Sequence, residues 1–240
     1  MKFCVRRSVH FDDFNRWFSG LKGIPLELAL PHDMQEFWSV VGRFGELAAY
    51  VRDNGFLVNS IHAPHGRLSG NAFMAWGPQV TRFAERTGAR LVVYHPEGNI
   101  AKVRKSRFQA TALGNIKVLQ GRTPVTVAIE TFGNKSRIFT PSEIIEHCLP
   151  MVLDTGHVDE EYAFELIEQY SGNIVAVHLS EKSIDPTFET KVMGRLPAES
   201  YGIEILKALQ ARGWNGTVTL EYLPDYKDGL FRRALQKKFG

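Results

Sequence analysis

Short apolar runs alternate with amphipathic segments along the whole chain, and this alternation limits the folds open to it. The runs are apolar on both faces and rich in Val, Ile and Leu, as expected of strands that are covered on both sides. The segments between them carry apolar residues at three-to-four spacing, which is typical of helices packed on a sheet. The strand-like runs are Phe3–Arg6, Ile24–Leu30, Phe56–Ile61, Arg90–Tyr94, Val125–Ile129, Met151–Leu153, Ile174–Val177 and Thr217–Leu220.

Helical patterns and their boundary signals fill the intervals between these runs. Thr140, Pro141 and Glu143 offer a capping residue, a first-turn proline and an early acid at the start of one helix. Glycines between a helical pattern and the next strand are typical of left-handed helix ends, and they are Gly55, Gly88, Gly121 and Gly213. The clearest helical patterns are Phe37–Val51, Ala72–Thr87, Ala101–Leu119, Glu161–Tyr170 and Ile203–Ala211.

Eight alternations without a long linker or a low-complexity segment predict an α/β fold, the (β/α)8 TIM barrel. The 240 residues suit one domain spanning 1–240. The competing fold is a doubly wound open sheet. That fold predicts a glycine-rich phosphate loop after an early strand, and the chain has none.

Composition and charge exclude several other classes of protein. A net charge of +3 and a pI near 8.8 allow an anionic substrate without demanding a nucleic acid. The start, MKFCVRRSVHFDDF, lacks the apolar stretch of a signal peptide, and no segment approaches the ~18 apolar residues of a membrane span. Cys4 and Cys148 lack a CxxC partner and are predicted to be buried, reduced thiols. These features predict a cytoplasmic protein without membrane contact, and they leave its oligomeric state open.

Four successive strand-like runs in the second half of the chain each end in a potential metal ligand. These ligands are Glu130, Asp154, His178 and Glu221. Carboxylate and imidazole groups are ligands for a divalent cation. Parallel strands closed into a barrel bring such ends together at one rim, where the active sites of these barrels lie. The pattern therefore predicts a metal enzyme.

Histidines also gather at the ends of the strands, along with Glu27. A single histidine is more often a hydrogen-bonded surface or core residue than a ligand, and we retain that ordinary role for His10, His32 and His147. As a set, however, the strand-end histidines favour a metal site at the rim. Six of the eight histidines lie at or just after a strand end: His32, His62, His65, His95, His157 and His178.

The strand-end motifs resemble those of the xylose isomerase-like TIM barrel superfamily. The motifs are IHAPHG, VYHPEGN, IETFGN, LDTGHV, VHLSEK and LEYLP, and their order and spacing match over nearly the whole chain. The superfamily includes sugar isomerases and epimerases and also the metal-dependent apurinic endonucleases. The resemblance implies that one divalent metal ion (Mn, Mg or Zn) is held by Glu130, Asp154, His178 and Glu221.

The resemblance also implies roles for three further histidines. His62 and His95 match positions that hold an additional metal in the endonucleases, with Glu130 as the bridging ligand. His157 matches a histidine that contacts the substrate in the epimerases and a third metal in the endonucleases.

One stretch departs from the endonuclease pattern. Thr190–Ser200 (TKVMGRLPAES) lacks the Asp-x-His pair that completes the third metal site of the endonucleases. His157 would then have no partners for a third metal. The same stretch contains Arg195, near the place where related epimerases have a substrate-binding arginine, although their glycine-rich continuation is absent here.

Two glutamates on opposite sides of one cation suit proton transfer next to a carbonyl. The cation would stabilise a cis-enediolate, while Glu130 and Glu221 would remove and return the proton. We therefore predict a sugar or sugar-phosphate isomerase or epimerase, with His157 and Arg195 positioning a small-molecule substrate. The alternative is an apurinic endonuclease-like phosphodiesterase in which both glutamates are only ligands and the metal activates water. The basic run Lys102–Arg107 suits either a solvated helix face or a phosphate contact.

Overall fold

A computed structural model describes residues 1–98, 102–133, 137–180, 201–221, 232–233 and 235–240. The strands follow one another in chain order as a closed parallel barrel, with helices between them. This confirms the prediction of an α/β protein with the (β/α)8 TIM barrel fold. The strands are β1 (Lys2–Ser8), β2 (Pro25–Ala29), β3 (Leu57–His62), β4 (Leu91–Tyr94), β5 (Thr126–Glu130), β6 (Met151–Asp154), β7 (Ile174–Leu179) and β8 (Thr217–Leu220).

The helices occupy the intervals that the sequence predicts, with one difference. The pattern Phe37–Val51 forms two α-helices separated by the 3-10 turn η1, which contains Gly42 after two β-branched valines. The helical elements are α1 (Phe14–Trp17), α2 (Met34–Val40), η1 (Val41–Arg43), α3 (Phe44–Asp53), α4 (Phe73–Thr87), α5 (Lys102–Gln120), α6 (Pro141–Glu146), α7 (Glu160–Tyr170), η2 (Ser171–Asn173) and α9 (Tyr201–Ala211).

The chain divides into two compact units, each described here by itself. The β2–β5 unit comprises Arg7–Glu130 and Asn134–Thr140. The β6–β1 unit comprises Met1–Arg6, Thr131–Gly133 and Pro141–Gly240, and so joins most of the first strand to the last three. The assignment of the whole chain to one domain stays a prediction.

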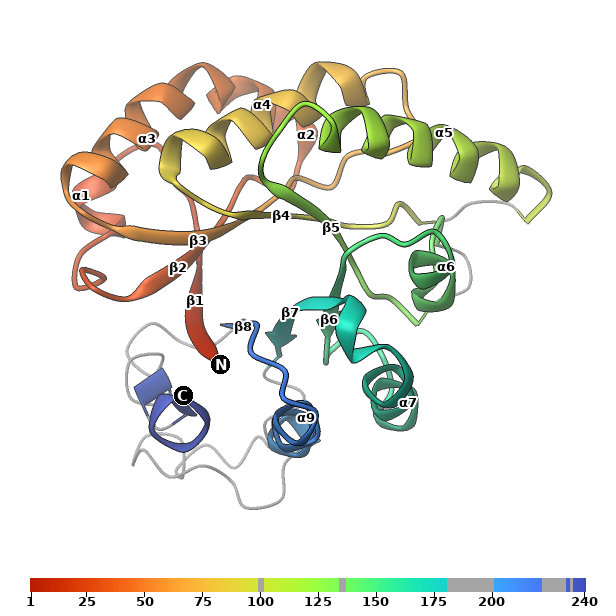
Figure 1. Ribbon diagram of the computed structural model, residues 1–240. Coiled ribbons are helices and arrows are strands. Elements are labelled where there is room, and N and C mark those ends of the chain that lie inside the picture. The colour runs from red at the N-terminus through yellow and green to blue at the C-terminus, as the bar shows by residue number, and fades with distance from the viewer. Residues whose placement is uncertain (99–101, 134–136, 181–200, 222–231, 234) are drawn as a thin grey trace. The chain divides into compact units, whose positions relative to one another are not determined.

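In the β2–β5 unit, helices α3, α4 and α5 lie on one side of the four strands (Figure 1). The buried side chains of this unit include several large aromatic rings, which contribute to a close-packed core. Trp76 of α4 is 2% exposed, and its ring lies 4.9 Å from Phe73 and 5.6 Å from Tyr94 of β4, measured between ring centroids. Trp76 therefore anchors a helix to the sheet and does not line an open surface.

In the β6–β1 unit, β1 pairs in parallel with β8, from Lys2 opposite Thr217 to Val5 opposite Leu220. β8 pairs in turn with β7, and β7 with β6. The amino group of Met1 donates to the Oδ1 atom of Asn215 at 2.9 Å and to the carbonyl of Phe239 at 3.3 Å. Both ends of the chain are thus tied to the same unit.

Helix ends in both units close with a residue in the left-handed region. After α4, Gly88 has φ 77°, and the next N–H, of Ala89, donates to the carbonyl of Ala84. After α6, Cys148 takes the same place with φ 55°, and Leu149 N–H donates to Ile144. Cys148 is exposed, so the prediction of two buried thiols holds for Cys4 alone.

The prediction of a left-handed glycine fails at Gly121. Gly55 and Gly213 both have φ 70°, but Gly121 is not among the glycines with positive φ. Its N–H donates to the carbonyl of Lys117, so the helical hydrogen-bond pattern of α5 continues through it. Among the described helices, none is both long and apolar enough to cross a membrane.

Candidate metal centre

Three of the predicted ligands lie together at the ends of neighbouring strands in the β6–β1 unit. Asp154 ends β6 and stands opposite His178 of β7 in the parallel register, and Glu221 directly follows β8. All three are 1% exposed or less. Buried ionisable groups are costly unless they are paired or bind a cation. We call these residues, with Arg6 and His157, the carboxylate cluster.

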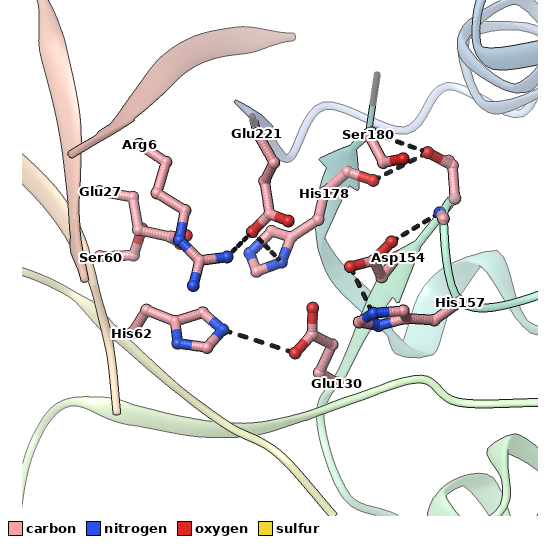
Figure 2. A network of polar contacts seen from close by, with 12 residues as sticks. Arg6, Glu27, Ser60, His62, Glu130, Asp154, His157, His178, Ser180 and Glu221 are labelled. Atoms are coloured by element: carbon pink, nitrogen blue, oxygen red, sulfur yellow. Dashed lines mark hydrogen bonds and ion pairs between the residues drawn. The ribbon is translucent and has the colours of Figure 1, made fainter. Parts of the chain in front are cut away.

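Glu221 lies between a guanidinium and an imidazole (Figure 2). Its Oε1 atom is 3.0 Å from Nδ1 of His178 and also contacts Nη1 of Arg6, whose side chain is only 8% exposed. Arg6 reaches Glu221 because Val5 is opposite Leu220, which places the next residue of each strand side by side. Since an arginine does not lose its proton in a protein, Arg6 stabilises the ionised form of Glu221.

Hydrogen bonds with a backbone N–H and with a hydroxyl oxygen hold Asp154 in place. The N–H of Gly156 donates to Oδ1 of Asp154 at 2.6 Å, and the Asp154 N–H donates to the hydroxyl of Thr131 at 2.9 Å. A side chain at Gly156 would not fit, because its Cβ would lie 2.5 Å from Oγ of Ser180. The glycine of the LDTGHV motif is therefore required by a close approach between two strand ends.

His157 is the half-buried member of the carboxylate cluster. Its Nδ1 atom is 3.2 Å from Oδ2 of Asp154, and its ring stacks on Phe132 at 3.9 Å between centroids. The carboxylate orients one edge of the imidazole, and the phenyl ring covers one face. The ring is thereby held in one orientation while about a third of it stays open to solvent.

The other predicted ligands gather in the β2–β5 unit. His62 ends β3, His95 follows β4 and Glu130 ends β5, so three adjacent strands each contribute one donor. Nε2 of His62 lies 3.4 Å from Oε2 of Glu130, and Nε2 of His95 contacts the same oxygen (Figure 2 shows the His62 contact). We call these residues, with His32 and His65, the imidazole cluster.

His32 and His65 extend this cluster beyond the predicted ligands. The His65 ring centroid lies 4.4 Å from that of His32 and 4.1 Å from that of His95. Removal of its ring from water, followed by the charges of His95, His32 and His62, lowers the pKa of His65 to about 3. His65 is therefore neutral at neutral pH.

The β2–β5 unit also contains two buried acids that accept hydrogen bonds. Glu27 of β2 is fully buried, and its Oε2 atom accepts from the Ser60 hydroxyl at 2.8 Å. Glu97, two residues after His95, accepts from the Ser69 N–H at 3.2 Å. Sequence patterns place Glu27 at a strand end, but they do not identify either acid as a partner of a particular group.

Each unit thus brings together the predicted ligands that it contains. Both clusters are built from carboxylate and imidazole groups, a donor set that suits a divalent metal. A shared site for Glu130 with Asp154, His178 and Glu221 stays a prediction. Arg195 lies outside the described residues. In the basic run, Arg104 and Arg107 are exposed, as on a solvated helix face.

The sequence analysis missed Arg6. Arg6 ends the first predicted strand, but an arginine is not a metal ligand, so the strand-end pattern does not single it out. The pairing of β1 with β8 makes Arg6 the neighbour of Glu221, and that register is not visible in either strand alone.

Comparisons with known proteins show similarity of fold. No family model and no curated protein sequence matches the chain. Solved structures do match: 3-keto-D-glucoside 4-epimerase from E. coli has 14% identity and a TM-score of 0.68, covering 99% of this chain and 98% of that one. The IolI protein with a bound zinc atom has 17% identity and a TM-score of 0.64, covering 100% and 96%.

An endonuclease also shares the fold. Endonuclease IV from Thermus thermophilus has 15% identity and a TM-score of 0.63, covering 99% of this chain and 100% of that one. Xylose isomerase domain proteins are among the other matches. The chain therefore has the fold of the xylose isomerase-like TIM barrel proteins, and these neighbours include both sugar enzymes and a DNA enzyme.

Proposed function

We propose that the protein is a metal-dependent isomerase or epimerase of a sugar, a sugar phosphate or a related hydroxy-carbonyl compound. The observation that carries the proposal is the burial of Glu130, Asp154, His178 and Glu221 at the ends of four consecutive barrel strands. Since active sites of such barrels lie at the carboxyl ends of the strands, these groups have the place and chemistry of a catalytic metal site. The E. coli epimerase and the zinc-binding IolI protein support this proposal by analogy of fold.

The two glutamates would carry the proton transfer. When bound, a divalent ion would stabilise negative charge on the substrate oxygens in the cis-enediolate. Glu130 would remove the proton beside the carbonyl, and Glu221 would return it to the other face or to the adjacent carbon. Arg6 and His178 hold the Oε1 atom of Glu221 in place, so the position of the second carboxylate is fixed before the substrate arrives.

His157 would position the substrate. Its ring is the half-buried, solvent-accessible member of the carboxylate cluster, held by Asp154 and Phe132. An imidazole fixed in this way can donate to or accept from a substrate hydroxyl without reorienting. Arg195 stays a weaker proposal for the same role.

The donor set leaves the choice among Mn, Mg and Zn to experiment. The carboxylates suit Mn or Mg, and the histidine pair His62 and His95 would add a second ion that favours Zn. The proposed chemistry requires a small-molecule substrate, and the oligomeric state stays open.

Solvent exchange tests the reaction directly. The purified protein would be incubated in deuterium oxide with a panel of ketoses and aldoses and each candidate metal, and deuterium at the carbon beside the carbonyl would be followed. We expect exchange with at least one substrate, and its loss in Glu221→Gln. His147→Gln, a change outside both clusters, is the matched control and should leave exchange intact. No exchange across the panel with metal bound would count decisively against the isomerase.

A metal-dependent phosphodiesterase acting on abasic DNA is the second candidate. The contacts of His62 and His95 with Glu130 favour it, because two cations bridged by a carboxylate can clamp a phosphate and activate water. The similarity in fold to endonuclease IV adds to this. The missing Asp-x-His pair in Thr190–Ser200 and the modest net charge favour the isomerase. Incision of an abasic-site duplex that is lost in His95→Ala would reverse this ranking.

A further inference from the structure

Two histidines of the imidazole cluster have no part in the proposed reaction. His32 lies just after β2 and His65 just after β3, and these two strands are parallel neighbours. The N–H of His65 donates to the carbonyl of His32 at 2.9 Å, which ties the two loops together. Both residues are partly accessible at the surface, unlike the buried His62. The backbone thus holds two accessible imidazoles in a fixed relation.

Their separation is close to that of two imidazoles on one metal ion. A Zn–N bond of about 2.0–2.1 Å and tetrahedral geometry place the centroids of two ligating imidazoles about 5 Å apart. The His32 and His65 centroids are 4.4 Å apart with their planes inclined by 43°. A small outward movement of the two rings would bring their centroids to the spacing of two imidazoles on one metal ion. His95, at 4.1 Å from His65 and 6.5 Å from His32, is a third imidazole within reach.

We propose that His32 and His65 form an accessory binding site for a transition-metal ion, with ligands other than the Glu130, Asp154, His178 and Glu221 of the proposed reaction. Imidazole-only donors favour Zn²⁺, Ni²⁺ and Cu²⁺ over Mg²⁺ and Mn²⁺. The accessory site therefore selects borderline ions, and Mg²⁺ does not fill it. Neither histidine has a role in the proposed sugar chemistry, so the accessory site can be tested separately from it.

Counting bound Ni²⁺ tests the accessory site. Metal-free protein would be titrated with Ni²⁺ by calorimetry and equilibrium dialysis, in the presence of Mg²⁺. We expect His32→Ala plus His65→Ala to bind one equivalent less than the wild type. His147→Ala, which removes an imidazole from the other unit, is the matched control and should bind as many equivalents as the wild type. Thermal unfolding verifies that each variant is folded.

Further variants separate this inference from the proposed function. His32→Gln and His65→Gln, made singly, should each weaken the same equivalent by about tenfold or more, and they serve if the double variant does not fold. Glu130→Gln plus Glu221→Gln should leave that equivalent in place, even if the isomerase proposal is wrong. Unchanged Ni²⁺ stoichiometry and affinity in the histidine variants would overturn the accessory site.

Discussion

The two halves of the barrel present different chemistry at their strand ends. The carboxylate cluster of the β6–β1 unit combines two acids with a guanidinium and two imidazoles. The imidazole cluster of the β2–β5 unit gathers four histidines around a single acid, Glu130. The difference teaches that the strand ends of one fold need not carry the same donors. Oxygen donors favour hard cations, whereas imidazoles favour borderline ones, so the two clusters should differ in metal preference.

The largest expected effect comes from removing one acid from each cluster. Glu130→Gln plus Glu221→Gln keeps the size of both side chains but removes their charge and their capacity as bases. We expect solvent exchange to fall by at least about 10³-fold, because proton transfer and metal binding are both impaired. Elemental analysis of protein purified without chelator gives the metal content. Full occupancy in this double variant would refute the ligand assignment.

A change confined to one cluster should alter metal preference. His62→Ala plus His95→Ala removes two imidazoles from the β2–β5 unit, so Zn²⁺ affinity should fall by about 10 to 100-fold while Mn²⁺ affinity changes less. Asp154→Asn removes a carboxylate instead, so it should lower the affinity for Mn²⁺ more than the affinity for Zn²⁺. Competition dialysis with both ions measures the ratio. An equal loss of both ions in both variants would mean that the clusters do not differ in selectivity.

The carboxylate cluster contains a buried cation, Arg6, whose removal should change the stability of the protein. Arg6→Met leaves the buried Glu221 without its cation, so the free energy of unfolding of the metal-free protein should fall by about 3 kcal/mol. A bound divalent ion should recover part of this loss, because it supplies positive charge to the same cluster. Urea unfolding with and without metal measures both values.

The matched control for this change is an exposed ion pair. Arg52 lies 3.3 Å from Asp53, and both side chains are about two-thirds exposed. Arg52→Met should therefore change the free energy of unfolding by less than about 1 kcal/mol, with or without metal. A loss in Arg6→Met that is equally small would show that Arg6 and Glu221 do not form a buried pair in solution.

The close approach at Gly156 gives a smaller effect within the same cluster. Gly156→Ala places a methyl group against Ser180 and should lower the free energy of unfolding by about 1–3 kcal/mol. Adding Ser180→Gly removes the two Ser180 atoms nearest to the methyl group and should restore part of the loss, while the Oδ1 atom of Asp154 stays 3.2 Å from it. If the second change brings no recovery, contact with Ser180 is not the reason for glycine at this position.

The smallest expected effect on stability comes from the left-handed residue that follows a helix in each unit. Cys148→Gly replaces a left-handed non-glycine residue and should raise the free energy of unfolding by about 1 kcal/mol. Gly88→Ala, in the β2–β5 unit, should lower it by a similar amount. Thermal unfolding of both variants measures the two changes in stability. A loss of stability in Cys148→Gly would contradict the backbone strain assigned to Cys148.

The fold could be predicted from sequence because buried parallel strands have a distinctive pattern. Each predicted strand overlaps an observed one, and Thr217–Leu220 matches at both ends. Helix interruptions are harder, because the apolar periodicity of Phe37–Val51 continues through the turn at Gly42. Helix ends depend on local hydrogen bonds. Gly121, predicted to be left-handed, therefore continues the helical pattern, whereas Cys148, for which no helix end was predicted, is left-handed.

The candidate site could be predicted only as far as strand ends define it. Glu130, Asp154 and His178 end their strands and Glu221 follows one, so the sequence identifies them without knowledge of packing. Arg6 and His32 depend on which strands and loops are neighbours. Arg6 needs the register of β1 on β8, and His32 needs the hydrogen bond between the loops after β2 and β3. Such pairings are set by the fold as a whole.

The union of β1 with β8 has a consequence for synthesis on the ribosome. Lys2 pairs with Thr217, so β1 cannot meet that partner before residue 217 has been made. Strands β2 to β5 are contiguous in sequence and can pair with one another earlier. Chains released before residue 217 would carry a β1 edge that lacks β8, and an unpaired edge of this kind promotes aggregation. Premature termination before residue 217 should therefore yield insoluble protein.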